Sequence, residues 1–284
     1  MREQAFRFGR ASHLIGITGI PTPVSAEVGV IVLNAGLVHR VGPFRMNVEM
    51  TRRLNARGYP TLRFDMSTLG DSGASDQSQS RTQQVCADVD DAMQLLGEQS
   101  GCSRFIVIGL CSGAQNAHTV AGTDAKVAGA VFLDGYAYRT TGYRLRHYLP
   151  RLFDFGRWRR VLSRRRSGGA WSSANPTVAP DEEPIFAVAP AQQSQVRSDL
   201  ASMLDRGVKL CMIYSGGISN YFNHARQFRE CFGSVVRREG FHTGYLQDAD
   251  HTYILTGDRG RLFDGIEQWL SRNFPVATAG KGHE

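Results

Sequence analysis

The stretch Phe105-Ile106-Val107-Ile108-Gly109-Leu110-Cys111-Ser112-Gly113 decides the fold. Its first part is an apolar run rich in β-branched residues, which is typical of a strand buried on both faces. Two glycines then flank Cys111 at a distance of two positions, and glycine lets the backbone reverse sharply from a strand into a helix. Because such a turn holds its central residue in a strained conformation at the carboxyl end of the strand, we expect Cys111 to be a nucleophile.

Two other interpretations of this turn stay open at this point. If Ser112 were the nucleophile, Leu110 and Ala114 would occupy the flanking positions, and a leucine there would crowd the turn. We therefore favour Cys111 over Ser112. The turn can also be an ordinary strand-to-helix connection of another α/β fold, with Cys111 as a small buried hydrophobic residue.

The rest of the chain alternates strand-like apolar runs with amphipathic helical stretches, which predicts an α/β fold with a mostly parallel sheet and helices on both faces. Strands are expected at 5–9, 13–20, 28–33, 61–64, 105–110, 127–133, 208–214 and 241–246, the first two forming an antiparallel hairpin at the sheet edge. Helices are expected at 47–57, 82–97, 114–120 and 261–274. Reactive groups of parallel sheets gather at the carboxyl ends of the strands, where Gly36, Cys111, Asp134 and His251 fall.

His251 is the candidate general base. It follows the last predicted strand and precedes the last predicted helix, whereas the other seven histidines have no comparable position. Nucleophile, acid and histidine in this chain order, each after its own strand, form a known triad arrangement. The alternative is a solvated loop histidine.

The third member of the triad is open between Asp134 and Asn220. The commonest position for the acid is the loop after the next-to-last strand, but Ser215-Gly216-Gly217-Ile218-Ser219-Asn220 contains no carboxylate. Asp134 ends the strand that follows Cys111, and we favour it over the amide of Asn220, although it can also be a simple turn residue. A thiol ionises more readily than a hydroxyl, so a cysteine needs less help from this group than a serine does.

An oxyanion hole is expected from two backbone N–H groups. One belongs to Ser112, the residue after the nucleophile, and the other to Leu37, behind Gly36 in the loop after the 28–33 strand.

Several segments resemble the α/β-hydrolase superfamily, in particular bacterial hydrolases associated with the exosortase A system and their serine-aminopeptidase-like relatives. The resembling stretches are Leu14-Ile15-Gly16-Ile17, Asn34 to Pro43, Leu62-Arg63-Phe64-Asp65, Gly70-Asp71-Ser72-Gly73, Gly109 to Ala114 and Asp250-His251-Thr252. The resemblance implies an α/β-hydrolase fold, a nucleophile at Cys111, a base at His251 and an oxyanion loop near Leu37. The chain departs from the pattern where Met66-Ser67-Thr68 replaces a glycine–histidine turn and where the usual acid loop lacks its aspartate.

A second resemblance concerns the acid. Val131-Phe132-Leu133-Asp134-Gly135-Tyr136 is similar to the strand-end aspartate of thioesterase domains from polyketide and peptide assembly lines. This similarity implies acyl-thioester chemistry.

We expect one hydrolase core, formed by residues 1–138 and 207–284, with a basic lid insertion at 139–206 that covers the nucleophile. The first part of the insertion sets ten arginines against the single acid Asp154, interleaved with aromatic residues and leucines; the arginines are Arg139, Arg144, Arg146, Arg151, Arg157, Arg159, Arg160, Arg164, Arg165 and Arg166. It can be a solvated lid helix, or a docking surface for an acidic acyl carrier protein. An anionic membrane surface is less favoured, and nucleic acid is not expected. Residues 167–183 are expected to form a mobile loop.

Composition restricts the remaining choices. The net charge of +7 is concentrated in the insertion, so it does not imply a uniformly basic surface. No run approaches the roughly 20 apolar residues of a membrane span, and the first residues lack an apolar signal core, which predicts a cytoplasmic protein. The five cysteines show neither a CxxC pair nor a zinc-like spacing, so we expect free thiols, no metal and no organic cofactor.

These features together predict a cysteine hydrolase or acyl-transfer enzyme that acts on an ester or thioester through an acyl-cysteine. A thioesterase of a biosynthetic pathway is the most concrete version. An acyltransferase or a condensing or cyclising enzyme on the same fold is the nearest alternative. A non-catalytic protein that binds partners through the basic insertion is the alternative from another class.

Overall fold

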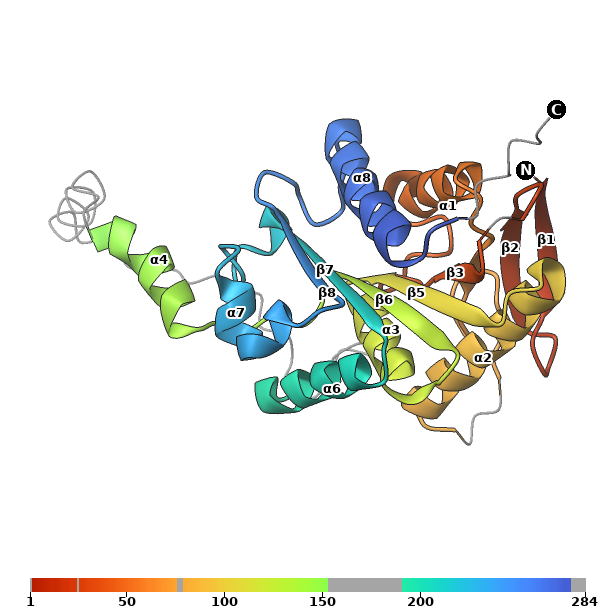
Figure 1. Ribbon diagram of the computed structural model, residues 1–284, viewed down its shortest axis with the longest axis horizontal. Helices are drawn as coiled ribbons and strands as arrows, with labels where there is room; N and C mark the ends of the chain where they lie inside the picture. Colours follow the sequence, from red (N-terminus) through yellow and green to blue (C-terminus); the bar gives the residue numbers. More distant parts are fainter. Residues whose placement is uncertain (1, 25, 76–78, 153–190, 277–284) are drawn as a thin grey trace, which may run out of the picture.

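One eight-stranded sheet forms the centre of the computed structural model, which describes residues 2–24, 26–75, 79–152 and 191–276 (Figure 1). The strand order is β1-β2-β4-β3-β5-β6-β7-β8, with antiparallel pairing at β1–β2 and β2–β4 and parallel pairing elsewhere. The strands are β1 Arg2–Phe8, β2 Leu14–Ile20, β3 Val28–Val32, β4 Thr61–Asp65, β5 Arg104–Leu110, β6 Val127–Leu133, β7 Lys209–Ser215 and β8 Phe241–Leu246. The predicted mostly parallel α/β fold and its edge hairpin are confirmed.

Helices cover both faces of the sheet. They are α1 Met46–Ala56, α2 Arg81–Ser100, α3 Ser112–Thr123, α4 Thr141–Leu152, α6 Gln193–Asp205, α7 Gln227–Phe232 and α8 Thr256–Asn273, with short 3-10 turns η1 Pro43–Arg45, η2 Gly216–Ile218 and η3 Gly233–Arg237. In Figure 1, α1 and α8 lie on one side of the sheet, and α2, α3 and α6 lie on the other. None of the described helices combines the length and the apolarity needed to cross a bilayer.

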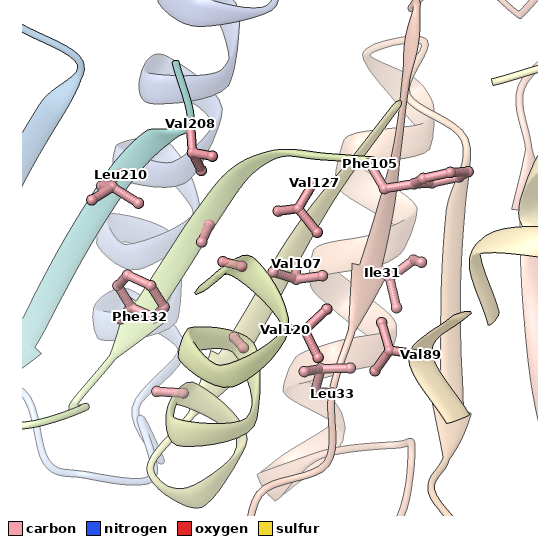
Figure 2. Close-up of a cluster of buried hydrophobic side chains, with 14 of the residues drawn as sticks. Ile31, Leu33, Val89, Phe105, Val107, Val120, Val127, Phe132, Val208 and Leu210 are labelled. Carbon is pink, nitrogen blue, oxygen red and sulfur yellow. The ribbon is translucent and has the colours of Figure 1, made fainter. Parts of the chain in front are cut away.

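Strand β5 is buried on both faces, as its unbroken apolar run predicted. Val107 points to the core under α2 and α3, where it joins Val89 and Val120 (Figure 2). Its neighbours Ile106 and Ile108 point to the opposite core, under α1 and α8. A strand sandwiched in this way gives the turn at its end a rigid base, because both of its faces are packed.

Two helices were not predicted from the sequence. Helix α6 lies inside the range 139–206 expected to be the insertion, yet its buried Val196, Leu200 and Met203 pack in the core beneath the sheet. It connects to β7 as an ordinary crossover helix. Helix α7 has only six residues, too few for a helical period to show in the sequence.

Before α6, the described part of the expected insertion is residues 139–152 with α4, which projects outward beyond α7 in Figure 1. The expectation that the insertion covers the nucleophile is not met by this part, because Cys111 is exposed. Residues 153–190, which include Asp154, the arginines from Arg157 onward and the expected mobile loop, lie outside the described residues.

The turn between β5 and α3 depends on two glycines. An ideal Cβ on Gly109 would lie 2.1 Å from the carbonyl oxygen of Gly113, and one on Gly113 would lie 2.4 Å from the carbonyl oxygen of Asn34. Real Cβ atoms do not come so close to backbone oxygens, so any side chain here would displace the turn.

Gly109→Ala is therefore expected to destabilise the protein by about 2 kcal/mol or more, because backbone rather than a flexible side chain blocks the new methyl group. Gly260→Ala is the matched control. A Cβ on Gly260 meets nothing within 4 Å inside α8, so it should stabilise the helix by roughly 0.5–1 kcal/mol. Urea unfolding of both variants measures the difference. Equal stabilities of the two variants would contradict this account of the turn.

Candidate active site

Cys111 lies in the sharp turn between β5 and α3. Its backbone has φ 56° and ψ −117°, a conformation that non-glycine residues rarely adopt. Leu110 ends β5 and Ser112 begins α3, so no linking residues separate the strand from the helix except Cys111 itself. The side chain is exposed at the carboxyl edge of the sheet, where a substrate can reach it.

His251 and Asp134 meet beside this turn. The Asp134 Oδ2 atom lies 2.7 Å from His251 Nδ1, and the aspartate side chain is fully buried whereas the histidine is partly exposed. Ser215 holds the carboxylate from the other side: its backbone N–H donates to Oδ1 at 2.6 Å and its hydroxyl to Oδ2 at 2.7 Å. With Nδ1 bound to Asp134, the imidazole presents Nε2 to the thiol.

The electrostatics favour an ion pair between sulfur and imidazole. A hydrogen bond with His251 is the largest cause that lowers the pKa of Cys111, and the backbone N–H of Ser112 lowers it further. The hydrogen bond with Asp134, followed by that with Cys111, raises the pKa of His251 to about 10. Thiolate and imidazolium therefore stabilise one another around neutral pH.

Asn220, the alternative orienting group, does not occupy this position. The residue is exposed, and its backbone carbonyl accepts hydrogen bonds from Tyr143 Oη at 2.6 Å and Arg139 Nε at 2.9 Å. His251 Nδ1 is already bound to Asp134. The geometry thus brings together Cys111, His251 and Asp134.

The two loops expected to form the oxyanion hole also lie in contact. The backbone N–H of Gly36 donates to the Ser112 hydroxyl at 2.7 Å, which ties the loop after β3 to the first turn of α3. Gly36 has φ +53°, and the following Leu37 is 68% exposed. Ser112 therefore contributes its side chain to hold the loop, in addition to the backbone N–H expected from the sequence.

Buried Asp65, at the end of β4, fixes the shape of the same loop. It accepts from the backbone N–H of Arg40 at 2.5 Å, from the Arg40 guanidinium and from Asn34 Nδ2 at 3.2 Å. Asn34 Nδ2 also donates to the Val38 carbonyl at 3.0 Å, and its Oδ1 accepts from Met66 N–H at 2.8 Å. A buried carboxylate with this many donors is well satisfied, so the loop that carries Leu37 is held at both ends.

The departure at Met66-Ser67-Thr68 serves packing in this structure. Ser67 donates to Asp88 Oδ1 at 2.7 Å and lies 2.8 Å from His13 Nε2. All three side chains are buried. This second cluster of serine, histidine and aspartate is therefore closed to substrate.

Sequence reasoning missed the features that bring the histidine loop to the acid. A Cβ on Gly216 would lie 1.7 Å from the Gln247 carbonyl oxygen, and one on Gly217 would lie 2.1 Å from the His251 nitrogen. The two glycines after β7 thus let the backbone of the histidine loop pack closely against this strand end, and Ser215 holds Asp134 by hydrogen bonds. The pair of adjacent glycines directly after a strand was the available signal.

No group of three or more histidine, cysteine or acidic side chains suited to a metal ion occurs among the residues that the structure describes. The five cysteines are free thiols in this structure.

A mostly parallel sheet with a strained residue between strand and helix, and with an aspartate and a histidine from later strand ends, defines an α/β hydrolase. The chain belongs to the alpha/beta hydrolase family, whose model matches residues 30–283. The predicted hydrolase class is confirmed at this level. No curated protein matches the chain significantly in sequence.

Solved structures show the same fold at low sequence identity. An esterase of Pyrococcus furiosus is 16% identical with a TM-score of 0.60, over 95% of this chain and 90% of that one. An esterase domain of a Rhodothermus marinus protein is 14% identical with a TM-score of 0.55, over 96% and 99%. A serine hydrolase of Xanthomonas campestris described as lacking a lid is 13% identical with a TM-score of 0.54, over 98% and 96%.

The lowered pKa of Cys111 predicts a specific pH dependence of alkylation. The thiolate fraction rises as the pH passes the pKa, so iodoacetamide should reach half its maximal rate at a pH below the roughly 8.5 of an ordinary thiol. His251→Ala removes the largest cause of the shift and should move this midpoint upward. Rates of carbamidomethylation at Cys111, followed by peptide mass spectrometry in a Cys86→Ala background, measure both values. An unchanged midpoint in His251→Ala would contradict the ion pair.

Proposed function

We propose that this hydrolase uses Cys111 as its nucleophile and transfers an acyl group from a thioester to water through an acyl-cysteine. The observation that carries the proposal is His251, placed between the thiol and a buried carboxylate 2.7 Å from Nδ1. An exposed thiol with a lowered pKa supports nucleophilic chemistry, because the thiolate is the reactive form.

In the first half-reaction, the Cys111 thiolate attacks the acyl carbonyl carbon, and the carbonyl π electrons move to oxygen. The backbone N–H groups of Leu37 and Ser112 stabilise this oxyanion. When the carbonyl re-forms, the bond from carbon to the leaving sulfur breaks, and the imidazolium of His251 gives its proton to the departing thiolate. An S-acyl Cys111 and a neutral imidazole remain.

In the second half-reaction, neutral His251 takes a proton from a water molecule as its oxygen attacks the acyl-cysteine carbonyl. Collapse of the second tetrahedral intermediate breaks the bond between carbon and the Cys111 sulfur. The thiolate regains its imidazolium partner, and the acid product leaves. Asp134 keeps the Nδ1 proton in place throughout and stabilises the positive charge on the ring.

A cysteine nucleophile favours thioesters over oxygen esters. The tetrahedral intermediate expels its better leaving group, and a thiolate leaves more easily than an alkoxide. On an ester, expulsion of Cys111 competes with loss of the alkoxide, which needs the proton of His251 to leave as an alcohol. On a thioester, the two sulfurs are equivalent leaving groups, so acylation can proceed. This agrees with the thioesterase-like position of Asp134 at the end of β6.

Hydrolysis is favoured over transfer to a second acceptor because Cys111 is exposed, which gives water access to the acyl-enzyme. An acyltransferase, or a condensing or cyclising enzyme, would need to keep water away from this intermediate. The non-catalytic alternative depended on the absence of an acid from the loop after β7. Asp134 supplies a carboxylate to the histidine from the end of β6, which weakens that alternative.

The narrower expectations belong to this proposal. They are kinship with exosortase-A-system-associated hydrolases, a place in a biosynthetic pathway in the cytoplasm, and an acidic acyl carrier protein as partner of the basic insertion. Arg139 and Arg146, at the base of α4, make hydrogen bonds to Asn220 in the loop after β7 and to Glu230 in α7, so basic residues of the insertion lie beside these two elements.

Incubation of His251→Gln with a short acyl thioester, at a pH where the thiol is ionised without its partner, is expected to add one acyl mass to Cys111. Deacylation needs His251 to take a proton from water, so the acyl-cysteine should accumulate in this variant. Intact and peptide mass spectrometry locate the adduct. Cys111→Ala should abolish both the adduct and turnover, whereas Cys86→Ala, which removes a thiol from α2, should change neither. Turnover by Cys111→Ala at the rate of the unmodified protein would exclude the proposed nucleophile.

A comparison of Asp134→Asn with Asn220→Ala identifies the group that orients the imidazole. Asp134→Asn is expected to lower kcat by about 100-fold or more, since it removes the charge that supports the imidazolium. Asn220→Ala should lower kcat little, because Asn220 supplies a backbone carbonyl that alanine retains. Steady-state kinetics with one thioester measure both, and a larger loss in Asn220→Ala would reverse the assignment.

A further inference from the structure

A cationic pocket of about 570 Å³ lies on α7 and η3, beside the base of α4. Its lining includes Arg226, Arg229 and Arg237, all of them exposed. Within the described part of the chain, none of these three guanidinium groups forms an ion pair with a carboxylate. The adjacent Arg238, in contrast, points away to Asp205 at 2.5 Å. Three positive charges therefore face one open space.

The one acidic residue of the described lining does not neutralise this pocket. Glu230 is bound by Arg146, with contacts of 2.7 Å to Nη1 and 3.0 Å to Nη2, and it also accepts from the Thr140 hydroxyl. These contacts lower the pKa of Glu230, the hydrogen bond from Arg146 being the largest cause. Because its charge is already balanced by Arg146, the pocket keeps an excess of positive charge. Arg197 of α6 lies near the junction of α7 and η3, with its guanidinium 3.5 Å from an ideal Cβ on Gly233.

The pocket lies along the chain segment that leaves the active site. Tyr221 is close enough to Asp134 and Cys111 for both to contribute, after burial, to raising the pKa of its hydroxyl. Tyr221 and Arg226 are five positions apart in the chain, so their Cα atoms are at most about 18 Å apart. Arg146 connects the segment after Tyr221 to the pocket. Its Nε donates to Asn223 Oδ1 at 3.1 Å, and its Nη atoms donate to Glu230 of the pocket lining.

We propose that this pocket, lined by Arg226, Arg229 and Arg237, binds a phosphate group on the thiol half of the thioester substrate. The inference rests on the proposed function and specifies its substrate class: an acyl group carried by a phosphate-bearing thiol. A guanidinium group can donate two parallel hydrogen bonds to two oxygens of a phosphate. Several guanidinium groups together match the charge of a phosphate better than they match the single charge of one carboxylate. With the acyl carbon at Cys111, such a thiol would extend along the loop after β7 toward α7.

Two thioesters with the same acyl group test this proposal. One is the thioester of coenzyme A, which carries phosphates, and the other is the thioester of N-acetylcysteamine, which carries none. Each of Arg226→Ala, Arg229→Ala and Arg237→Ala should raise KM for the first substrate by about 10-fold, the loss of one hydrogen bond to a charged group, and leave kcat/KM for the second unchanged. Arg81→Ala, which removes an exposed arginine at the start of α2, is the matched control and should affect neither substrate. Equal effects of the pocket variants on both substrates would overturn the proposal.

A binding measurement separates this inference from the catalytic one. Calorimetric titration of free coenzyme A into Cys111→Ala needs no turnover. Binding that weakens by about 10-fold in Cys111→Ala/Arg229→Ala and falls with added salt supports the pocket even if Cys111 proves not to be catalytic. Undiminished binding in the double variant overturns the proposal even if the thioesterase activity is established.

The same titration distinguishes two sources of the phosphate. A carrier protein bearing a phosphopantetheine arm presents a phosphodiester, and the same carrier without its arm presents only acidic side chains. If the arm-bearing carrier binds, the armless carrier does not, and Arg229→Ala loses this binding, the phosphate belongs to a carrier protein. If coenzyme A binds and neither form of the carrier does, the phosphate belongs to a free thiol. If the armless carrier binds as tightly as the arm-bearing form and Arg229→Ala weakens both equally, the pocket recognises protein carboxylates, and the phosphate assignment is wrong.

Discussion

The hydrogen bond between Asp134 and His251 connects the end of β6 to the loop after β8, 117 residues further along the chain, and the site depends on it. A buried aspartate is costly unless donors surround it, and here Ser215 supplies two. The carboxylate in turn keeps the imidazole protonated and directed at the sulfur. The lowered pKa of the Cys111 thiol therefore depends on two successive hydrogen bonds, from the buried Asp134 to His251 and from His251 to the exposed sulfur.

The elements that could be predicted from the sequence are those with a local physical cause. The unbroken apolar run of β5 and the two glycines around Cys111 predicted the strained turn, because burial on both faces and backbone reversal leave direct traces in composition. The position of His251 between the last strand and the last helix was predicted from chain order in the same way. Asp134 was favoured over Asn220 from its place at the end of a strand, and the structure places its carboxylate 2.7 Å from His251 Nδ1.

The rest could not be predicted because it depends on contacts between distant segments. The Ser112 hydroxyl holds Gly36 from 76 residues away, and nothing local to either residue indicates this. Asp65 shapes the loop after β3 from the end of a neighbouring strand. Helix α6 was not predicted because it follows the arginine-rich segment, and the composition of that segment led to one interpretation for the whole 139–206 range. The buried residues of α6 nevertheless belong to the core.

The place of the acid at the end of β6 has a consequence for how this scaffold can diversify. When the loop after β7 supplies the catalytic carboxylate, its length and course are restricted because the carboxylate must reach the imidazole. Here the loop needs only Ser215 and two glycines at its start, and the segment from Ser219 onward makes no bond to the imidazole. Substitutions and insertions in that segment can reshape what the enzyme recognises without disturbing proton transfer, so specificity and chemistry are free to evolve separately.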